Sequence, residues 1–213
     1  MQYRSSGFFD IPPVVKNLIL INIVIWVAQV FFAMQGRPLE EYGALQPIQR
    51  GDFKIWQPIT YMFMHASWNP LTGVEYFHIL FNMFVLWFLG RTLENLWGGK
   101  RFLQFYVICG IGAAAAHLIT SPNASAVGAS GAIMGMMAAF AYLFPNTEFY
   151  VWGILPVKAK FLIPGLMLVD LFGVLSPKEG DDVAHWAHLG GAIVGLVIVI
   201  FWNRNKGNRR NFY

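Results

Sequence analysis

The chain has 213 residues, of which 56% are hydrophobic and only 12% are charged, about half of the roughly 25% charged share of soluble proteins. This composition excludes a water-soluble domain, and it excludes a disordered chain because disorder requires low hydrophobicity and high net charge. The formal net charge of +4 comes from scattered residues, so we expect no nucleic-acid partner. The single cysteine, Cys109, excludes an internal disulfide and a thiolate metal cage, and we expect no metal or other cofactor. The chain is therefore predicted to be an integral membrane protein.

Six apolar segments approach the length that a bilayer requires, about 20 residues or fewer where protein covers the helix. They are residues 14–34, 75–97, 101–120, 129–144, 161–175 and 184–203. The first follows Arg4, Asp10 and the Pro12-Pro13 pair, and it is too long for the core of a signal peptide, so we interpret it as an uncleaved anchor. The pattern predicts an all-α, polytopic bundle of six transmembrane helices, in one domain over residues 1–213 with its core at about 14–203.

The longest connection, residues 35–74, is rich in aromatic side chains: Tyr42, Phe53, Trp56, Tyr61, Phe63 and Trp68. Such a segment is too apolar for a solvated connector, and segments of this kind lie in the membrane interface. We therefore predict a membrane-associated first loop.

With six spans, both chain ends lie on the same side of the membrane. That side would hold 11 of the 15 Lys and Arg residues: Arg4, Lys16, Arg91, Lys100, Arg101, Lys158, Lys160, Arg204, Lys206, Arg209 and Arg210. Cytoplasmic loops carry an excess of Lys and Arg, so both termini are predicted to be cytoplasmic. We expect a bacterial cytoplasmic (inner) membrane as the location, since no transit peptide or further domain is evident.

In this orientation the second, fourth and sixth helices begin at the outer side, and each has polar residues in its first two turns. The second carries His78 and Asn82, which share one face because they lie four residues apart. The fourth opens with Ser130, and the sixth carries His185 and His188. At 1.5 Å per residue all of them lie roughly 5–10 Å below the helix entry points. Polar side chains at this depth usually face the bundle interior or a water-filled cavity.

The fourth helix is short, about 22 Å for residues 130–144 against a hydrocarbon core near 30 Å. An uncharged segment, residues 120–129, precedes it. We predict that the chain dips into the membrane before it turns helical, which is tolerated only where protein or water covers the backbone. Ser130 would then stand at a helix N-terminus, where free N–H groups and the helix dipole favour a developing negative charge. An acyl-transfer nucleophile needs these conditions.

A serine hydroxyl needs a base to take its proton, and His188 is the best candidate. Gly191 and Gly195 follow it on nearly the same helix face, and the fourth helix has Gly131 and Gly135 in the matching arrangement. Small residues on facing membrane helices let the backbones approach closely. This approach could bring His188 within hydrogen-bond reach of the serine.

Asp170 is the carboxylate that we place well inside a span, but no spacing ties it to His188. The residues therefore predict a Ser–His dyad without an acidic third member. His78 and Asn82 can donate hydrogen bonds and, together with the backbone N–H of Ser130, could form an oxyanion hole. Each such donor stabilises the transition state of other acyl-transfer enzymes by roughly 3–4 kcal/mol.

At this point the chain resembles the rhomboid family of intramembrane serine proteases. The matching segments are HILFN at 78–82, GASG at 128–131 and AHLGGAIVG at 187–195, with Trp56 and Glu94 also fitting the family pattern. The resemblance extends over about residues 14–203 and includes the six-helix core. Three motifs in order, with the expected spans between them, make it specific.

The resemblance implies Ser130 as the nucleophile and His188 as general base and acid, with His78 and Asn82 in the oxyanion hole. The substrates would be single-span membrane proteins in the lipid bilayer, cut within or just outside the transmembrane segment. The fifth helix and the loop after it would act as a lateral gate and cap. Two positions depart from the family pattern. Gln57 stands where many relatives have Arg, and Met134 where some place an aromatic side chain against the catalytic histidine.

Each candidate residue also has an ordinary structural interpretation. Ser130 could be a helix N-cap and His188 a packed side chain bonded to a carbonyl, while His78 and Asn82 could join helices by hydrogen bonds. For three other histidines the structural interpretation is favoured: His65, His117 and His185. Asp170 is left open between a functional site at membrane depth and a solvated or paired group.

Two other functions stay open at this stage. One is a catalytically inactive relative that binds transmembrane helices. The other is a small transporter or haem-binding membrane protein that uses the histidines, with His78 facing His117 or His188. The natural substrate, the cleavage-site preference and the oligomeric state are not determined by these patterns.

Overall fold

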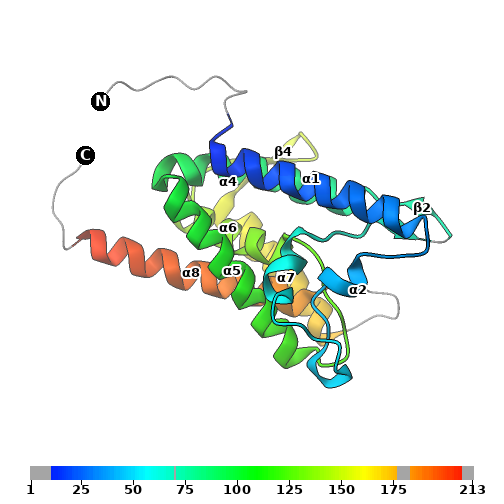
Figure 1. Ribbon diagram of the computed structural model, residues 1–213. Helices are drawn as coiled ribbons and strands as arrows, with labels where there is room; N and C mark the ends of the chain where they lie inside the picture. Colours follow the sequence, from blue (N-terminus) through cyan, green and yellow to red (C-terminus); the bar gives the residue numbers. More distant parts are fainter. Residues whose placement is uncertain (1–10, 70, 177–182, 208–213) are drawn as a thin grey trace.

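A computed structural model describes residues 11–69, 71–176 and 183–207, with the side chains of residues 205–207 excepted (Figure 1). Several residues that bear on the predicted topology lie outside this part of the chain: Arg4, Asp10, Lys178, Arg209 and Arg210. The loop that was expected to cap the site also falls largely outside it, at residues 177–182.

Six long helices occupy the predicted segments in the described part of the chain. They are α1 (Pro13–Ala33), α4 (Phe77–Trp97), α5 (Gly99–Thr120), α6 (Ser130–Leu143), α7 (Ala159–Leu175) and α8 (His185–Gly207). By length and hydropathy, three of the described helices could cross a bilayer: Pro13–Ala33, Gly99–Thr120 and the stretch His185–Arg204 of α8. Helix α6 is apolar but shorter. The chain is thus an all-α membrane protein, while the number of six spans stays a prediction.

The first loop is folded rather than extended. It contains α2 (Glu40–Gly43), the 3₁₀ turns η1 (Ile48–Arg50) and η2 (Tyr61–Phe63), the short helix α3 (Gln57–Thr60), and an antiparallel pair of β1 (Trp68–Asn69) and β2 (Gly73–Val74). A second hairpin, β3 (Glu148–Val151) paired with β4 (Leu155–Lys158), joins α6 to α7. The sequence patterns did not predict these hairpins, because strands of two to four residues are too short to establish a period-2 pattern.

Several contacts hold the first loop against the bundle. The Tyr61 hydroxyl donates to the carbonyl of Gly110 in α5 at 2.7 Å, and burial raises the pKa of this hydroxyl. Leu45 and Ala126 exchange two backbone hydrogen bonds of 2.9 and 3.0 Å, which tie the loop to the segment that leads into α6. The amide of Gly128 in that segment donates to the carbonyl of Tyr61. The loop therefore fixes the backbone just before Ser130, whereas its contact with the membrane stays a prediction.

Helix α6 lies at the centre of the bundle, in contact with α4, α5, α7 and α8. Its residues from Gly131 to Phe140 are all buried, as expected for a helix that is apolar on every face. The neighbouring helices cover most of it, which explains how a helix too short for a bilayer can be accommodated. Around this centre, α1 and α4 run side by side (Figure 1).

The α6–α8 contact is the most extensive helix pair in the described chain. A Cβ atom added to Gly195 would lie 2.5 Å from the carbonyl oxygen of Gly135, and one added to Gly135 would lie 2.9 Å from that of Gly191. No side chain fits in these positions without separating the backbones. The predicted close approach of the two glycine-bearing helices is therefore confirmed.

Glu94 joins the second long helix to the start of the first. Its two carboxylate oxygens accept hydrogen bonds from the backbone amides of Val14 (3.1 Å) and Val15 (2.8 Å). These amides are among those that the first turn of a helix leaves without partners, and a carboxylate there also interacts favourably with the helix dipole. Glu94 is buried, so the bond is protected from water.

We predict that Glu94→Gln lowers the free energy of unfolding by about 1–3 kcal/mol, because the amide offers one acceptor in place of two and leaves a buried donor unpaired. Thermal unfolding in detergent measures the effect. Glu148→Gln, which changes an exposed residue of β3, is the matched control and should change stability little. Equal unfolding midpoints for the two variants would contradict the capping role.

Candidate active site

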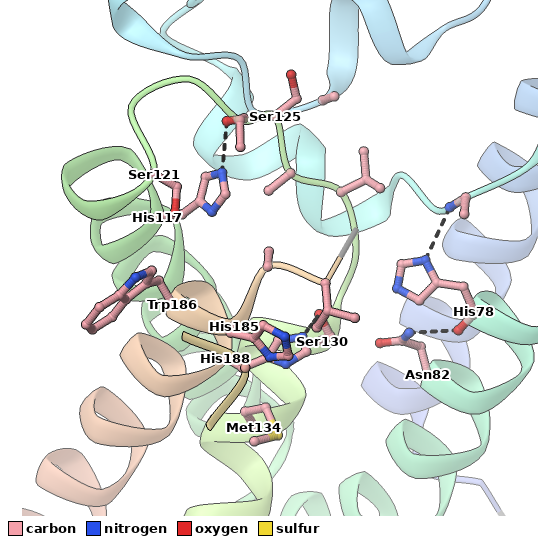
Figure 2. A pocket seen from close by; sticks show the side chains of 18 of the residues that line it. His78, Asn82, His117, Ser121, Ser125, Ser130, Met134, His185, Trp186 and His188 are labelled. Carbon is pink, nitrogen blue, oxygen red and sulfur yellow. Dashed lines mark hydrogen bonds between the residues drawn. The ribbon is translucent and has the colours of Figure 1, made fainter. Parts of the chain in front are cut away.

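The side chains of Ser130 and His188 are in direct contact. The Oγ atom of Ser130, the first residue of α6, lies 2.8 Å from Nε2 of His188, the fourth residue of α8. Figure 2 shows the two side chains meeting at the start of α6. The glycine spacing of the two helices predicted this pair, and the two side chains are within hydrogen-bond distance in the structure.

The opposite nitrogen of the His188 ring faces a carboxylate. Its Nδ1 lies 2.9 Å from Oδ1 of Asp170 in α7. A carboxylate oxygen only accepts, so Nδ1 carries the hydrogen and, in the neutral ring, Nε2 is free to accept the proton of Ser130. The order Asp–His–Ser along this chain of contacts is the order found in acyl-transfer triads.

The expectation that no carboxylate is tied to His188 is therefore wrong. Helices α7 and α8 are in contact, and the end of α7 lies against the start of α8, since a Cβ atom added to Gly173 would meet the His185 ring. Asp170 lies about 8 Å before the end of α7, and His188 about 5 Å after the start of α8, at 1.5 Å per residue. The sequence therefore contained a sign of this contact, because both residues lie at similar distances from the adjoining ends of their helices. Spacing along a single helix does not reveal it.

His185 also belongs to this cluster, although the sequence favoured a purely structural role for it. Its Nδ1 lies 2.7 Å from the same Oδ1 atom of Asp170. The ring occupies space that the missing side chain of Gly173 leaves free, since a Cβ atom there would collide with it. One carboxylate oxygen thus accepts from two histidines that lie three residues apart on α8.

His78 approaches the site from α4. Its Nδ1 accepts the backbone N–H of Ala66 at 3.2 Å, so the neutral ring carries its hydrogen on Nε2. That side of the ring faces the turn before α6, because a Cβ atom added to Gly128 would lie 3.0 Å from Nε2 and 3.4 Å from the Ser130 Oγ atom. An N–H donor is therefore held beside the serine.

Asn82 lies one turn further along α4 and is buried. Its Nδ2 donates to the carbonyl of His78 at 2.7 Å, which engages one of the two N–H bonds of the amide. Figure 2 shows His78 and Asn82 together on one helix, across from Ser130 and His188. The predicted sharing of one face by His78 and Asn82 is thus observed.

Apart from Asp170, these groups line one cavity of about 1210 Å³. Its lining includes the predicted site residues and extends to the first loop: His78, Asn82, Ser130, His188, Glu40 and Gln46. Pockets for small molecules have roughly 300–1,000 Å³, so this cavity can admit a larger ligand, such as an extended peptide segment.

Two histidines that were expected to be structural have protein partners. His65 is fully buried in the first loop, and its Nε2 lies 2.9 Å from Oδ1 of Asn22 in α1. Burial, with a smaller effect from nearby His78, lowers the pKa of His65 to about 3, so its ring is neutral and donates to the amide oxygen. His117 donates from Nε2 to the carbonyl of Ala124 at 3.0 Å. Both contacts agree with the structural interpretation.

The structure also shows what surrounds Gln57 and Met134, the two residues that depart from the family pattern. Gln57 is fully buried, and its Oε1 accepts the backbone amides of Gln46 (3.2 Å) and Lys54 (3.0 Å), so it organises the first loop. Met134 lines the cavity one turn after Ser130, and Figure 2 shows it beside the Ser130–His188 pair.

We predict that Gly128→Ala destabilises the protein more than a glycine substitution at an open turn. Gly128 has φ +126°, and an added Cβ would press against the His78 ring; a strained backbone of this kind costs about 1–3 kcal/mol. Gly73→Ala is the control, since Gly73 also has a positive φ, +86°, but no atom within 4 Å of the added Cβ. The unfolding midpoints of both variants in detergent test this, and an equal loss in each would mean that the contact with His78 is unimportant.

Comparison with known proteins gives one consistent result. A family model of the Rhomboid domain matches residues 52–205. Rhomboid-like protein 11, chloroplastic, of Arabidopsis thaliana is 30% identical over 207 residues, which are 93% of this chain and 66% of that protein. Rhomboid protease AarA of Providencia stuartii is 30% identical over 216 residues, 86% of this chain and 70% of that protein.

Rhomboid protease GluP of Bacillus subtilis is 35% identical over 159 residues, 74% of this chain and 28% of that protein. The chain spans less than two thirds of the length of several relatives, which are longer proteins. One relative is named as chloroplastic and another as mitochondrial, and a third comes from a bacterium. The location in a bacterial cytoplasmic membrane therefore stays a prediction.

Proposed function

The chain belongs to the rhomboid family, and from this premise we propose that it is an intramembrane serine endopeptidase that cleaves single-span membrane proteins within or beside the transmembrane segment. The observation that carries the proposal is the 2.8 Å contact between Ser130 Oγ and His188 Nε2. It joins a nucleophile and a base at the start of a buried helix, and the cavity beside them is large enough for a peptide.

In the proposed reaction, Ser130 Oγ bonds to the scissile carbonyl carbon as its proton passes to His188 Nε2. When the tetrahedral intermediate collapses, the carbon–nitrogen bond breaks and His188 returns the proton to the leaving amine. The acyl group then remains on Ser130 as an ester. Water attacks this ester while Nε2 takes its proton. The carbon–Oγ bond then breaks, His188 gives the proton to Ser130 Oγ, and the new carboxyl end of the substrate is released.

Negative charge on the carbonyl oxygen would be stabilised by donors that are already in place. The first amides of α6 have no acceptor within the helix, and the Ser130 N–H is among them. The Nε2–H group of His78 lies beside the same turn, held there by the Ala66 amide on the other side of the ring. The second N–H bond of Asn82 completes the proposed oxyanion hole. Donors fixed in advance need no rearrangement when charge develops.

Asp170 is proposed as the residue that positions His188. Its Oδ1 accepts from Nδ1 at 2.9 Å, which holds the ring in the tautomer that presents a basic Nε2 to Ser130. The negative carboxylate also stabilises the imidazolium that forms during both proton transfers. The proposed catalytic group is thus a triad rather than the dyad expected from the sequence.

We further propose six membrane spans, with both termini in the cytoplasm and the cavity opening toward the outer side. The placement of Lys and Arg supports this orientation, and the burial of α6 among four neighbouring helices from Gly131 to Phe140 is consistent with a short helix that protein largely covers. A catalytically inactive relative that only binds helices is less well supported, because the Ser130–His188 contact would then have no purpose.

We predict that Ser130→Ala and His188→Ala each reduce cleavage of a single-span reporter protein to background in detergent, since each removes a reacting group. A mechanism-based serine reagent should label the wild type and fail to label Ser130→Ala. His117→Gln, which changes a histidine of the same cavity outside the triad, is the control and should still cleave. Cleavage by Ser130→Ala at the wild-type rate would refute the proposed function.

We predict that Asp170→Asn lowers kcat by about a hundredfold, within the usual contribution of acid–base catalysis, and changes KM little. The neutral amide can accept a hydrogen bond from His188 but cannot stabilise its cationic form. Steady-state kinetics on the reporter measure the split, with Asp52→Asn at an exposed residue of the first loop as the control. The Asp170→Glu variant should recover part of the lost kcat, because it restores a carboxylate. An unchanged kcat in Asp170→Asn would contradict the triad and favour a Ser130–His188 dyad.

A further inference from the structure

Three side chains of types that can ligate metal ions lie together, and two of them, His185 and His188, line the active-site cavity. The Nδ1 atoms of His185 and His188 lie 2.7 and 2.9 Å from Oδ1 of Asp170, and one ligand atom from each residue lies within 4.8 Å of the others. We call these three residues the Asp–His–His cluster. We propose that the Asp–His–His cluster binds a divalent transition-metal ion such as Zn²⁺, and that the bound ion reversibly inhibits the enzyme. The inhibitory half of this inference rests on the proposed function, whereas the metal binding does not.

The ligand set suits zinc. Two imidazole nitrogens and one carboxylate oxygen are a common set of three protein ligands, with water in the fourth position of a tetrahedron. Zinc bonds of about 2.0–2.1 Å place tetrahedral ligand atoms about 3.3 Å apart. The two nitrogens therefore move about half an ångström away from Oδ1, and they approach each other from a separation of up to 4.8 Å. The sequence excluded a thiolate cage, and this site needs no cysteine.

The cluster is accessible but not fully exposed. The side chains of His185 and His188 are 16% and 18% exposed, and that of Asp170 is 11% exposed. Both histidines line the active-site cavity, as does Gly173, whose missing side chain leaves room for the His185 ring. An ion can therefore enter through the cavity, and water there can complete its coordination sphere.

Metal binding at Nδ1 of His188 would remove the base without displacing Ser130. In the metal-free site, Nδ1 carries the hydrogen and Nε2 accepts from the serine. A metal on Nδ1 uses the lone pair of that nitrogen, so the single hydrogen of the neutral ring moves to Nε2. Nε2–H then donates to Ser130 Oγ and cannot take its proton. No net proton is lost from the ring, and the reversal of this one hydrogen bond stops the reaction.

The chemistry also sets the selectivity. Mg²⁺ prefers six oxygen ligands in octahedral geometry, whereas imidazole nitrogens suit Zn²⁺ and other late first-row ions. The Asp–His–His cluster offers only one carboxylate, so we expect it to bind Zn²⁺ and not Mg²⁺.

The first experiment measures binding without any protease activity. Zn²⁺ is titrated calorimetrically into the full-length Ser130→Ala protein in detergent, which retains all three ligands. Adding His185→Asn to this protein keeps an N–H donor near the position of Nδ1 but removes the imidazole ligand. We expect this change to weaken Zn²⁺ binding by about 10- to 100-fold or more, since even residues that only support a ligand have effects of this size. Adding His117→Gln removes a histidine of the same cavity outside the cluster and should leave the affinity unchanged.

The second experiment measures inhibition of the protein with Ser130 intact, with each variant compared with its own metal-free rate. Zn²⁺ should inhibit reporter cleavage, EDTA should restore it, and Mg²⁺ should have no effect. The zinc concentration that halves the rate should rise in His185→Asn by the same factor as the dissociation constant, and it should not change in His117→Gln.

The possible results separate the two proposals. No Zn²⁺ binding to the Ser130→Ala protein, or equal affinity with and without His185→Asn, overturns the metal site whatever the enzyme does. Binding that depends on His185 together with undiminished cleavage under saturating Zn²⁺ overturns the inhibitory mechanism. An inactive wild type that still binds Zn²⁺ through His185 would refute the proposed protease while leaving the metal site standing.

Discussion

The close approach of α6 and α8 is the constraint on which the site depends. Where glycine faces glycine, the carbonyl oxygens of Gly135 and Gly191 lie where side chains would otherwise be. Apolar side chains cannot drive helices together in lipid, because the acyl chains are equally apolar, so packing of small residues takes over this role. The approach holds the first turn of α6 against the first turn of α8, and the hydrogen bond between Ser130 and His188 follows from that geometry.

A second constraint is the need to satisfy polar groups away from water. The backbone before α6 is held by the first loop through the paired amides of Leu45 and Ala126 and the bond from Gly128 to Tyr61. At the start of α1, the carboxylate of Glu94 accepts hydrogen bonds from two backbone amides. Unsatisfied backbone groups at membrane depth cost several kcal/mol each. If α6 begins below the membrane surface, as we propose, the loop packed over its start supplies the partners that its backbone needs there.

The arrangement around Asp170 shows how one buried carboxylate can link two histidines with different consequences. Its Oδ1 atom accepts from both His185 and His188, and only the second ring reaches Ser130. The same oxygen contacts both imidazoles. The proposed positioning of His188 and the proposed metal binding therefore rest on one geometry.

By itself, the sequence determined that this is a helical membrane protein and where its long helices lie, and it predicted that Ser130, His188, His78 and Asn82 lie at one depth. All four residues line one cavity. Hydrophobic runs and 3.6-residue spacing carry that information along each helix, and paired glycines even indicated which helices meet. Only the tertiary structure decided that Asp170 and His185 join His188, that His78 receives the Ala66 amide, and that the first loop folds over the start of α6. These contacts depend on the rotation and offset of one helix against another, and a periodic pattern within one segment does not specify either.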